Sequence, residues 1–125
     1  MARSAWAYDE ARLDVMEACF TPDARMTVQI ADAAAIGPFE GRPAVLELVR
    51  GSLAAQRDQR RHVISNVFFE SEDTDTAIVL STLTLLATAD GQITVLSAGV
   101  YRDHVVRGPD GWRFRERSLA LDRGY

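Results

Sequence analysis

The chain has 125 residues, of which 47% are hydrophobic and 26% charged, proportions typical of one globular domain spanning residues 1–125. Its net charge of -4 argues against nucleic acid or a membrane surface as a partner, because both call for a basic patch. All 14 positively charged side chains are arginines, which excludes chemistry that needs a lysine amine, such as Schiff bases or a phosphate-loop lysine.

The first predicted element is a helix from about Ser4 to Phe20. Its apolar residues recur at helical spacing, namely Leu13, Met16 and Phe20. Extending this stripe by one turn towards the N-terminus reaches Asp9, and then Ala5 and Trp6, so a carboxylate shares a face with core residues. The helix is expected to end at Thr21-Pro22, since proline disfavours helical geometry in the preceding residue.

A short strand is predicted at Arg25–Ile30, followed by a loop over residues 31–41 that contains two glycines and a proline. Pro43 then stands at the start of a second helix, where its missing N–H costs nothing. The apolar spacing of this helix continues to about Gln56.

Four segments rich in β-branched, leucine and aromatic residues follow, and they predict the strands His62–Glu70, Thr76–Thr88, Gln92–Arg107 and Trp112–Leu121. Turn residues at Asp90-Gly91 and Pro109-Asp110-Gly111 make these strands an antiparallel meander. Such long strands must coil, so the sheet can wrap around the helices. The predicted fold is an α+β cone, a curved and mostly antiparallel sheet around N-terminal helices.

Asp9 is the first candidate for chemistry. A carboxylate on the core stripe is expected to be largely buried, and burial favours the protonated acid unless hydrogen bonds or a cation offset it. Such a group suits general acid or base work near neutral pH. The alternative is a solvated residue near a frayed helix start, and spacing alone does not decide between them.

His62 opens the first strand of the meander, and strict alternation places it on one face with Ile64, Asn66 and Phe68. A histidine and an asparagine beside apolar residues suggest a polar point in a pocket. The alternative is a histidine satisfied by a backbone carbonyl. If Asp9 pairs with His62, the carboxylate would orient the imidazole and set its protonation.

Hydroxyl groups supply the remaining candidates. Ser81 and Ser97 alternate with apolar residues and could point inwards, or could simply fill the β surface. Tyr8 and Tyr101 are better placed as donors to a substrate carbonyl, because a buried phenol needs a partner. The alternating Arg113, Arg115 and Arg117 are assigned to the outer face of the sheet.

Three segments together resemble a known family. Tyr8–Ala24 (YDEARLDVMEACFTPDA), Arg61–Asn66 (RHVISN) and Tyr101–Asp122 resemble the opening helix, the histidine-bearing strand and the final hairpin of scytalone dehydratase and SnoaL-like proteins, in the nuclear-transport-factor-2-like superfamily. The last segment is also similar to the small β subunit of ring-hydroxylating dioxygenases. The fold hosts dehydratases, isomerases, cyclases and non-catalytic subunits, so the resemblance leaves the reaction open.

The dehydratase pattern matches this chain only in part. Its tyrosine–aspartate pair falls on Tyr8 and Asp9, and its first histidine falls on His62. Its second histidine and its asparagine fall near Ser81 and Ser97, so the opposite wall differs. The resemblance therefore implies a shared aspartate–histidine arm and a substrate other than scytalone.

From these residues we expect a cofactor-independent and metal-independent acid/base enzyme, a dehydratase, isomerase or cyclase, acting on a small apolar carbonyl or polyketide-type metabolite. The expected catalytic residues are Asp9, His62 and Tyr8. The expected substrate-binding residues are Trp6, Met16, Asn66, Phe68, Ser81, Ser97 and Tyr101, with Ile64, Leu83 and Val95 as further walls. The alternative is a non-catalytic binding or structural module like the dioxygenase β subunit.

The chain is expected to be cytoplasmic, because Cys19 is its single cysteine and its N-terminus lacks the apolar core of a signal peptide. The resemblance implies a homodimer formed through the outer face of the sheet. Val63, Val67 and Phe69 are assigned to that face by alternation.

Overall fold

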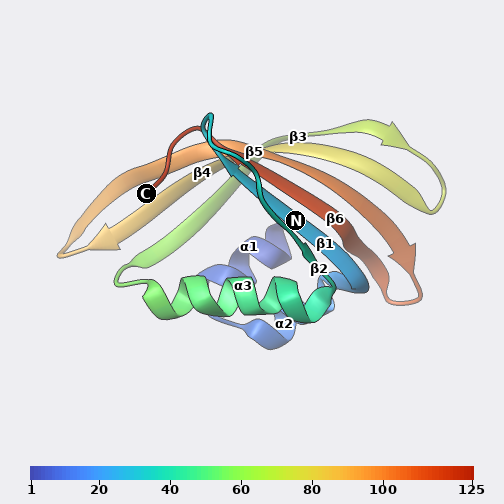
Figure 1. The fold of residues 1–125 in the computed structure, drawn as a ribbon, viewed down its shortest axis with the longest axis horizontal. Coiled ribbons are helices and arrows are strands. Elements are labelled where there is room, and N and C mark those ends of the chain that lie inside the picture. Colours follow the sequence, from blue (N-terminus) through green and yellow to red (C-terminus); the bar gives the residue numbers. More distant parts are fainter.

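The computed structural model describes all residues from 1 to 125 and consists of three helices and six strands (Figure 1). The helices are α1 (Ala2–Asp9), α2 (Leu13–Ala18) and α3 (Arg42–Ala55). The strands are β1 (Phe20–Ile30), β2 (Ile36–Glu40), β3 (Gln59–Glu72), β4 (Thr76–Ala89), β5 (Gln92–Gly108) and β6 (Gly111–Leu121).

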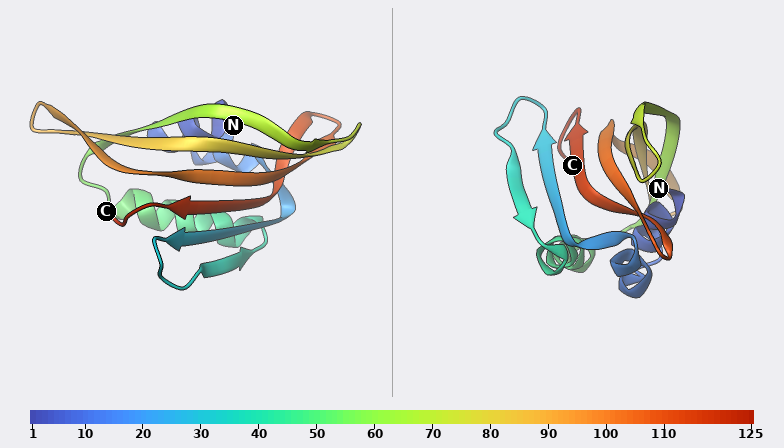
Figure 2. Two further views of the ribbon diagram at one scale, coloured as in Figure 1. Left: turned by 90° about the horizontal axis from the view of Figure 1, so that it is seen from above. Right: turned by 90° about the vertical axis from the view of Figure 1, so that its right-hand side faces the viewer.

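All six strands form one curved sheet in the order β2-β1-β6-β5-β4-β3. Only the β1–β6 pair is parallel, and β3 to β6 form the predicted antiparallel meander. The sheet curls over all three helices, which lie on its concave side, and its edge strands β2 and β3 do not meet (Figures 1 and 2). This architecture confirms the predicted α+β class with an open, cone-like sheet.

The N-terminal helix predicted over Ser4–Phe20 is two helices instead of one. Ala11 adopts a left-handed conformation with φ 54°, which an α-helix of L-residues cannot continue through. The chain therefore turns after Asp9, the last residue of α1, and α2 starts at Leu13. Phe20 already belongs to β1.

The predicted loop over residues 31–41 contains the short edge strand β2. Its backbone pairs antiparallel with β1, with Met26 opposite Phe39. The strand is hard to recognise in the sequence, because its alternation is weak and Gly37-Pro38 reads as a turn. Its position at the edge of the sheet accommodates the proline, since an edge strand does not need every backbone N–H for pairing. α3 begins as predicted, with Pro43 in its first turn.

The main hydrophobic core lies between the helices and the β1–β6 part of the sheet. It consists of Ala7, Met16, Phe20, Ala24, Val45, Val49 and Phe114. The rings of Phe20 and Phe114 pack at a centroid distance of 5.3 Å. This cluster joins all three helices to β1 and β6, and three of its members, Met16, Phe20 and Val49, also line a cavity on the concave face.

Three β-bulges reverse the side-chain alternation on which the face assignments depended. In β3 the bulge contains Asn66, at φ 51°, and Val67; in β5 it is at Leu96, and in β6 at Arg115. Each extra residue moves the side chains beyond it to the other face of the sheet.

The bulges overturn several predicted orientations. Phe68 pairs with Leu80 on the outer face instead of facing the cavity, and Phe69, predicted to lie outside, pairs with Val79 on the inner face. Val95 is 65% exposed on the outer face instead of forming a wall. Val63, before the first bulge, is on the outer face as expected.

Candidate active site

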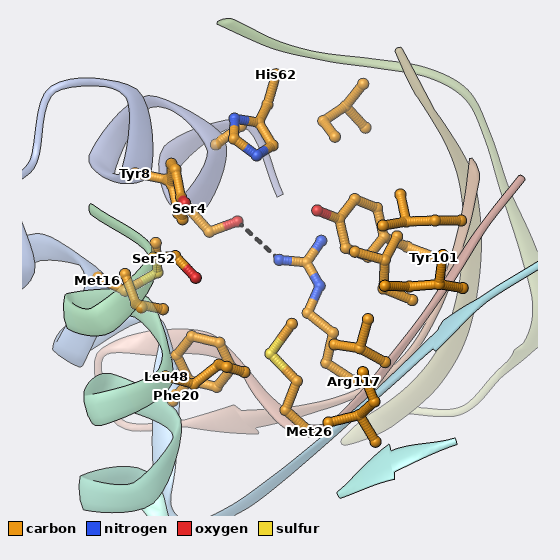
Figure 3. Close-up of a pocket in the computed structure, with 18 of the residues that line it drawn as sticks. Ser4, Tyr8, Met16, Phe20, Met26, Leu48, Ser52, His62, Tyr101 and Arg117 are labelled. Atoms are coloured by element: carbon orange, nitrogen blue, oxygen red, sulfur yellow. Dashed lines mark hydrogen bonds between the residues drawn. The ribbon is translucent and has the colours of Figure 1, made fainter. Parts of the chain in front are cut away.

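A cavity of about 230 Å³ lies between α1, α3 and the concave face of the sheet (Figure 3). Most of its lining is apolar and includes Met16, Phe20, Met26 and Ile64. Its polar lining residues are Ser4, Tyr8, Ser52, His62, Tyr101, Arg117 and Tyr125. An apolar enclosure with a few converging polar groups is the usual form of a small-molecule site.

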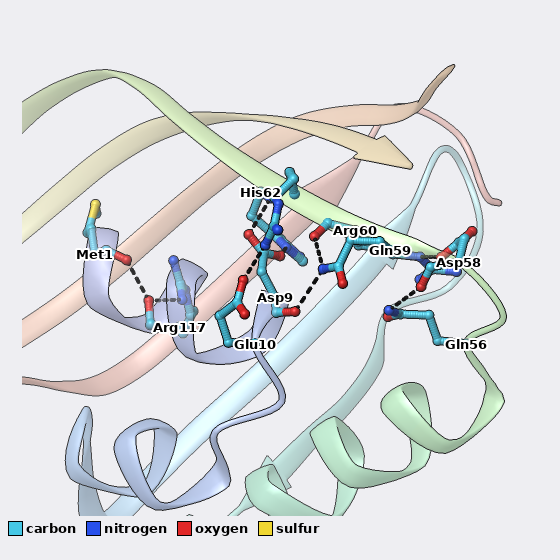
Figure 4. Close-up of polar contacts among 11 residues, drawn as sticks. Met1, Asp9, Glu10, Gln56, Asp58, Gln59, Arg60, His62 and Arg117 are labelled. Carbon is cyan, nitrogen blue, oxygen red and sulfur yellow. Dashed lines mark hydrogen bonds and ion pairs between the residues drawn. The ribbon is translucent and has the colours of Figure 1, made fainter. Parts of the chain in front are cut away.

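Asp9 and His62 form a buried pair at one end of this cavity (Figure 4). Asp9 Oδ1 lies 2.6 Å from His62 Nδ1, and Asp9 Oδ2 accepts the backbone N–H of His62 at 2.9 Å. The side chains of Asp9 and His62 are only 7% and 10% exposed. Both carboxylate oxygens therefore hold the same residue, one through its ring and one through its backbone.

The pairing determines which ring nitrogen is free. An ionised carboxylate can only accept hydrogen bonds, so Nδ1 of His62 must carry the proton that faces Asp9. In the neutral imidazole, Nε2 is then the unprotonated nitrogen. His62 lines the cavity, whereas Asp9 is absent from the lining and acts through the imidazole.

The end of α1 is fastened to β3 by further contacts around this pair. Gln59 Nε2 donates to the backbone oxygen of Asp9 at 2.9 Å, and Arg61 forms an ion pair with Glu10 (Figure 4). The break after α1 makes these contacts possible, because it exposes the carboxyl end of the helix to the strand. The position of Asp9 therefore depends on the turn at Ala11.

Two tyrosines line the same cavity. The Tyr8 ring lies 4.6 Å from the His62 ring, centroid to centroid, with the planes tilted by 59°. Burial raises the pKa of Tyr8 and of Tyr101, so both phenols stay protonated at neutral pH and can donate a hydrogen bond.

Arg117 is the main site residue that sequence reasoning missed. It was assigned to the outer face, but the bulge at Arg115 turns it into the cavity, and it is only 6% exposed. Its Nη1 donates to Ser4 Oγ at 3.3 Å, and its guanidinium lies 3.7 Å from the centre of the Tyr101 ring (Figure 3). Asp103 could have revealed this position from the sequence, because it alternates with Tyr101 and therefore shares the inner face of the strand. A carboxylate on an inner face needs a buried cation as its partner.

Asp103 is the partner of Arg117 and is fully buried. Its Oδ1 lies 3.0 Å from Arg117 Nε, at ion-pair distance but outside good hydrogen-bond alignment. Burial raises the pKa of Asp103 to about 6, and the positive charge of Arg117 opposes that rise. Two buried carboxylates therefore stand behind the lining, Asp9 behind His62 and Asp103 behind Arg117.

Five of the predicted substrate-binding residues do not line the cavity: Trp6, Asn66, Phe68, Ser81 and Ser97. Trp6 is exposed beside Arg12, because the cavity-facing side of α1 carries Ser4, Ala5 and Tyr8 instead. Asn66 is exposed within the β3 bulge, and the same bulge turns Phe68 outwards.

The two serines face inwards but are buried within the protein. Ser97 Oγ donates to the backbone oxygen of Arg123 at 2.8 Å, which fixes the C-terminal segment. Ser81 is 2% exposed, and its hydroxyl has no hydrogen-bond partner. Leu83, predicted as a wall, packs with Tyr101 and Leu121 behind the lining. The structure thus brings together Tyr8, Asp9, Met16, His62 and Tyr101 from the predicted set.

No three histidine, cysteine, aspartate or glutamate side chains gather at one point in a way that could hold a metal ion. Cys19 is half-buried, and burial raises the pKa of its thiol. None of the three helices is long and apolar enough to cross a membrane.

The fold and the cavity together make this chain an α+β cone whose first helix contributes a carboxylate to a histidine on the sheet. The chain belongs to the SnoaL-like domain family, whose family model matches residues 1–118. Its fold is similar to that of solved structures described as nuclear-transport-factor-2-like. A comparison with curated proteins finds no match.

Solved structures agree with the fold. A variant of Rv3472 from Mycobacterium tuberculosis, a protein of unknown function, is 25% identical, with a TM-score of 0.80 over 98% of this chain and 68% of its own. The β subunit of a proposed aromatic-ring-hydroxylating dioxygenase from Novosphingobium aromaticivorans is 20% identical, with a TM-score of 0.83 over 99% and 85%. A proposed dehydratase from Streptomyces avermitilis is 18% identical, with a TM-score of 0.75 over 95% and 88%.

Proposed function

We propose that the chain is a cofactor-independent acid/base enzyme, a dehydratase, isomerase or cyclase. Its substrate would be a small, largely apolar carbonyl compound or polyketide-type metabolite. The observation that carries this proposal is His62, held by both oxygens of Asp9 and lining an apolar cavity. A carboxylate-oriented imidazole is a general base suited to neutral pH.

In the proposed reaction, His62 Nε2 removes a proton from the carbon next to the substrate carbonyl. Asp9 stabilises the imidazolium that forms, and Tyr8 or Tyr101 donates a hydrogen bond to the carbonyl oxygen as it gains negative charge. In a dehydration, the C–H electron pair becomes the new double bond, and the imidazolium returns its proton to the departing hydroxyl to give water. An isomerisation returns the proton to another carbon.

Two variants test the catalytic arm, Asp9→Asn and His62→Ala. Each is expected to lower turnover by a factor on the order of a hundred or more, because positioned acid/base groups contribute about that much. Matched controls are Asp14→Asn, an exposed acid on α2, and His104→Ala, which pairs with Ile78 across the outer face. Neither control is expected to change turnover.

Since the substrate is unidentified, the assay is hydrogen exchange. A panel of cyclic and aromatic ketones and β-hydroxy carbonyl compounds is incubated in D₂O, and deuterium uptake beside the carbonyl and loss of water are followed by NMR and mass spectrometry. If a panel compound reacts and both site variants keep full activity, the proposed mechanism is wrong.

The alternative, a non-catalytic binding or structural module, is supported by a different observation. Asp9 also accepts hydrogen bonds that fasten α1 to β3, from Gln59 and from the backbone of His62. The likeness to a dioxygenase β subunit points the same way. A module predicts that Asp9→Asn lowers the free energy of unfolding while the wild-type chain exchanges no substrate hydrogen.

We also propose that the chain forms a homodimer through the outer face of the sheet. Support comes from the large apolar side chains exposed there, namely Val63, Phe68, Ile93, Val95 and Val100. Phe68→Lys and Val95→Lys together are expected to shift the sedimentation coefficient from dimer to monomer. A wild-type chain that sediments as a monomer at tens of micromolar would contradict the proposal.

A further inference from the structure

Arg117, which contacts Ser4 and Tyr101 at the cavity wall, has no task in the proposed reaction. Arg117 is on β6, Tyr101 on β5 and Ser4 on α1, and all three line the cavity (Figure 3). The side chain of Arg117 is 7% exposed, so its charge is removed from bulk water. A buried cation at a cavity wall is expensive unless the groups around it, or a ligand, satisfy it.

The protein satisfies Arg117 only in part. A guanidinium has five N–H groups. One Nη1 hydrogen goes to Ser4 Oγ at 3.3 Å, and Nε lies 3.0 Å from Asp103 Oδ1 without good alignment. Nη2 has no acceptor in the protein, and neither does the second hydrogen of Nη1. The unused donors therefore belong to both terminal nitrogens, the pair that can bind two oxygens at once.

The surroundings hold the guanidinium in place without using those donors. Its central carbon lies 3.7 Å from the centre of the Tyr101 ring and 4.3 Å from that of Phe114. Cation–π contacts with two rings hold the guanidinium in position. Ser4 is itself anchored, since its Oγ donates to the backbone oxygen of Met1 at 2.7 Å (Figure 4). The arrangement is pre-organised for an acceptor that the chain does not supply.

We propose that Arg117 binds the carboxylate of a small, otherwise apolar ligand, with the phenol of Tyr101 as an additional donor. A carboxylate offers two oxygens in the geometry of the unused N–H pair, and the apolar lining accommodates the rest of the molecule. The proposal concerns the same cavity as the proposed function and rests on it only in taking that cavity to be a ligand-binding site. It assigns Arg117 to binding and leaves proton transfer to His62.

A matched pair of probes tests this class, 2-naphthoate and 2-naphthamide, which share their shape and differ in charge. Binding to the full chain is measured by isothermal titration calorimetry at pH 7.5, without turnover. The wild-type chain is expected to prefer the carboxylate by about tenfold or more, as charge-assisted hydrogen bonds imply. Arg117→Met is expected to remove this preference, and Arg115→Met, an exposed arginine on the same strand, to keep it.

Asp103 separates a binding role from a structural one. Asp103→Asn removes the opposing charge and should tighten 2-naphthoate binding severalfold while leaving 2-naphthamide unchanged. The double variant Arg117→Met/Asp103→Asn removes both charges of this pair and should bind both probes equally, even if Arg117→Met alone fails to fold.

If the wild-type chain binds neither probe, or binds both equally, the inference is wrong. The same conclusion follows if the preference for the carboxylate survives in the double variant. A failure of the hydrogen-exchange assay leaves these binding results intact, so the two proposals stand or fall separately.

Discussion

Asp9 holds His62 through two different groups, the ring nitrogen Nδ1 at 2.6 Å and the backbone N–H at 2.9 Å. The first contact selects the tautomer of the imidazole, and the second fixes where β3 starts relative to α1. A single carboxylate thus couples the chemistry of the cavity to the packing of helix on sheet.

The tautomer of His62 is the first prediction. In the wild-type chain the neutral ring is expected to carry its proton on Nδ1, because only that arrangement pairs with an ionised carboxylate. Asp9→Ala removes the acceptor and should redistribute the proton between the two nitrogens. Long-range ¹H–¹⁵N correlation spectra of ¹⁵N-histidine-labelled protein report this directly, with His104 as the internal control. A wild-type proton on Nε2 would contradict the proposed base.

The stability contributed by Asp103 should depend on pH. Its pKa is raised to about 6 in the folded state, from 3.8 as an ordinary value, so the folded chain binds more protons than the unfolded chain between these pH values. Stability from this group is therefore present at low pH and lost as pH rises through about 6.

The variant Asp103→Asn isolates this effect. Between pH 4 and pH 7 the free energy of unfolding of the wild-type chain should fall relative to the variant, by about 2–3 kcal/mol. Urea denaturation at several pH values measures the difference. Arg117 and the half-buried amino group of Met1 are the charges that influence Asp103, so a pH-independent difference would show that they hold it ionised throughout.

Two glycines should respond in opposite directions to alanine. A Cβ on Gly99 in β5 would lie 2.3 Å from the backbone oxygen of Ala120, and that strand cannot yield easily. Gly99→Ala is expected to lower the free energy of unfolding by about 1–3 kcal/mol. Gly51 in α3 has no atoms within 4 Å of such a Cβ, so Gly51→Ala should raise it by about 0.5–1 kcal/mol. Chemical denaturation measures the free energy of unfolding of both variants. Equal changes in the two would contradict the close approach of Ala120 to Gly99 described here.

Asn66 should tolerate glycine but not a β-branched residue. Its φ of 51° lies in the left-handed region, where asparagine and glycine are acceptable and valine is strained. Asn66→Val is expected to lower the free energy of unfolding by about 1–3 kcal/mol, and Asn66→Gly to change it little. Thermal unfolding followed by circular dichroism distinguishes the two variants. If Asn66→Val is as stable as the wild-type chain, residue 66 does not adopt the left-handed conformation of the bulge.

Much of the fold could be predicted from composition and periodicity, because the long meander strands and the Pro43 helix start are local signals. The Asp9–His62 contact was only a possibility from the sequence pattern, and the family resemblance is what implied it. Breaks in regularity could not be predicted. The left-handed Ala11 and the bulge at Arg115 involve no glycine, asparagine or other residue type that marks such a position in the sequence.

The face that a side chain occupies was therefore predicted correctly only where no bulge separates it from the residues used to assign that face. His62 and Ile64 precede the β3 bulge and line the cavity, whereas Phe68 follows it and faces out. Arg117 follows the β6 bulge and was assigned to the wrong face. Alternation counts residues reliably only while the hydrogen-bond ladder is unbroken.

The bulge at Arg115 also gives this scaffold an unusual route for evolutionary change. Deleting that one residue would restore regular alternation and turn Arg117 out of the cavity, together with Leu119 and Leu121, which follow it on the same strand and also line the cavity. A relative lacking the residue would keep the histidine arm and lose the cation. A single deletion in a terminal strand, rather than a substitution in the pocket, can thus remove a charged group from the cavity wall.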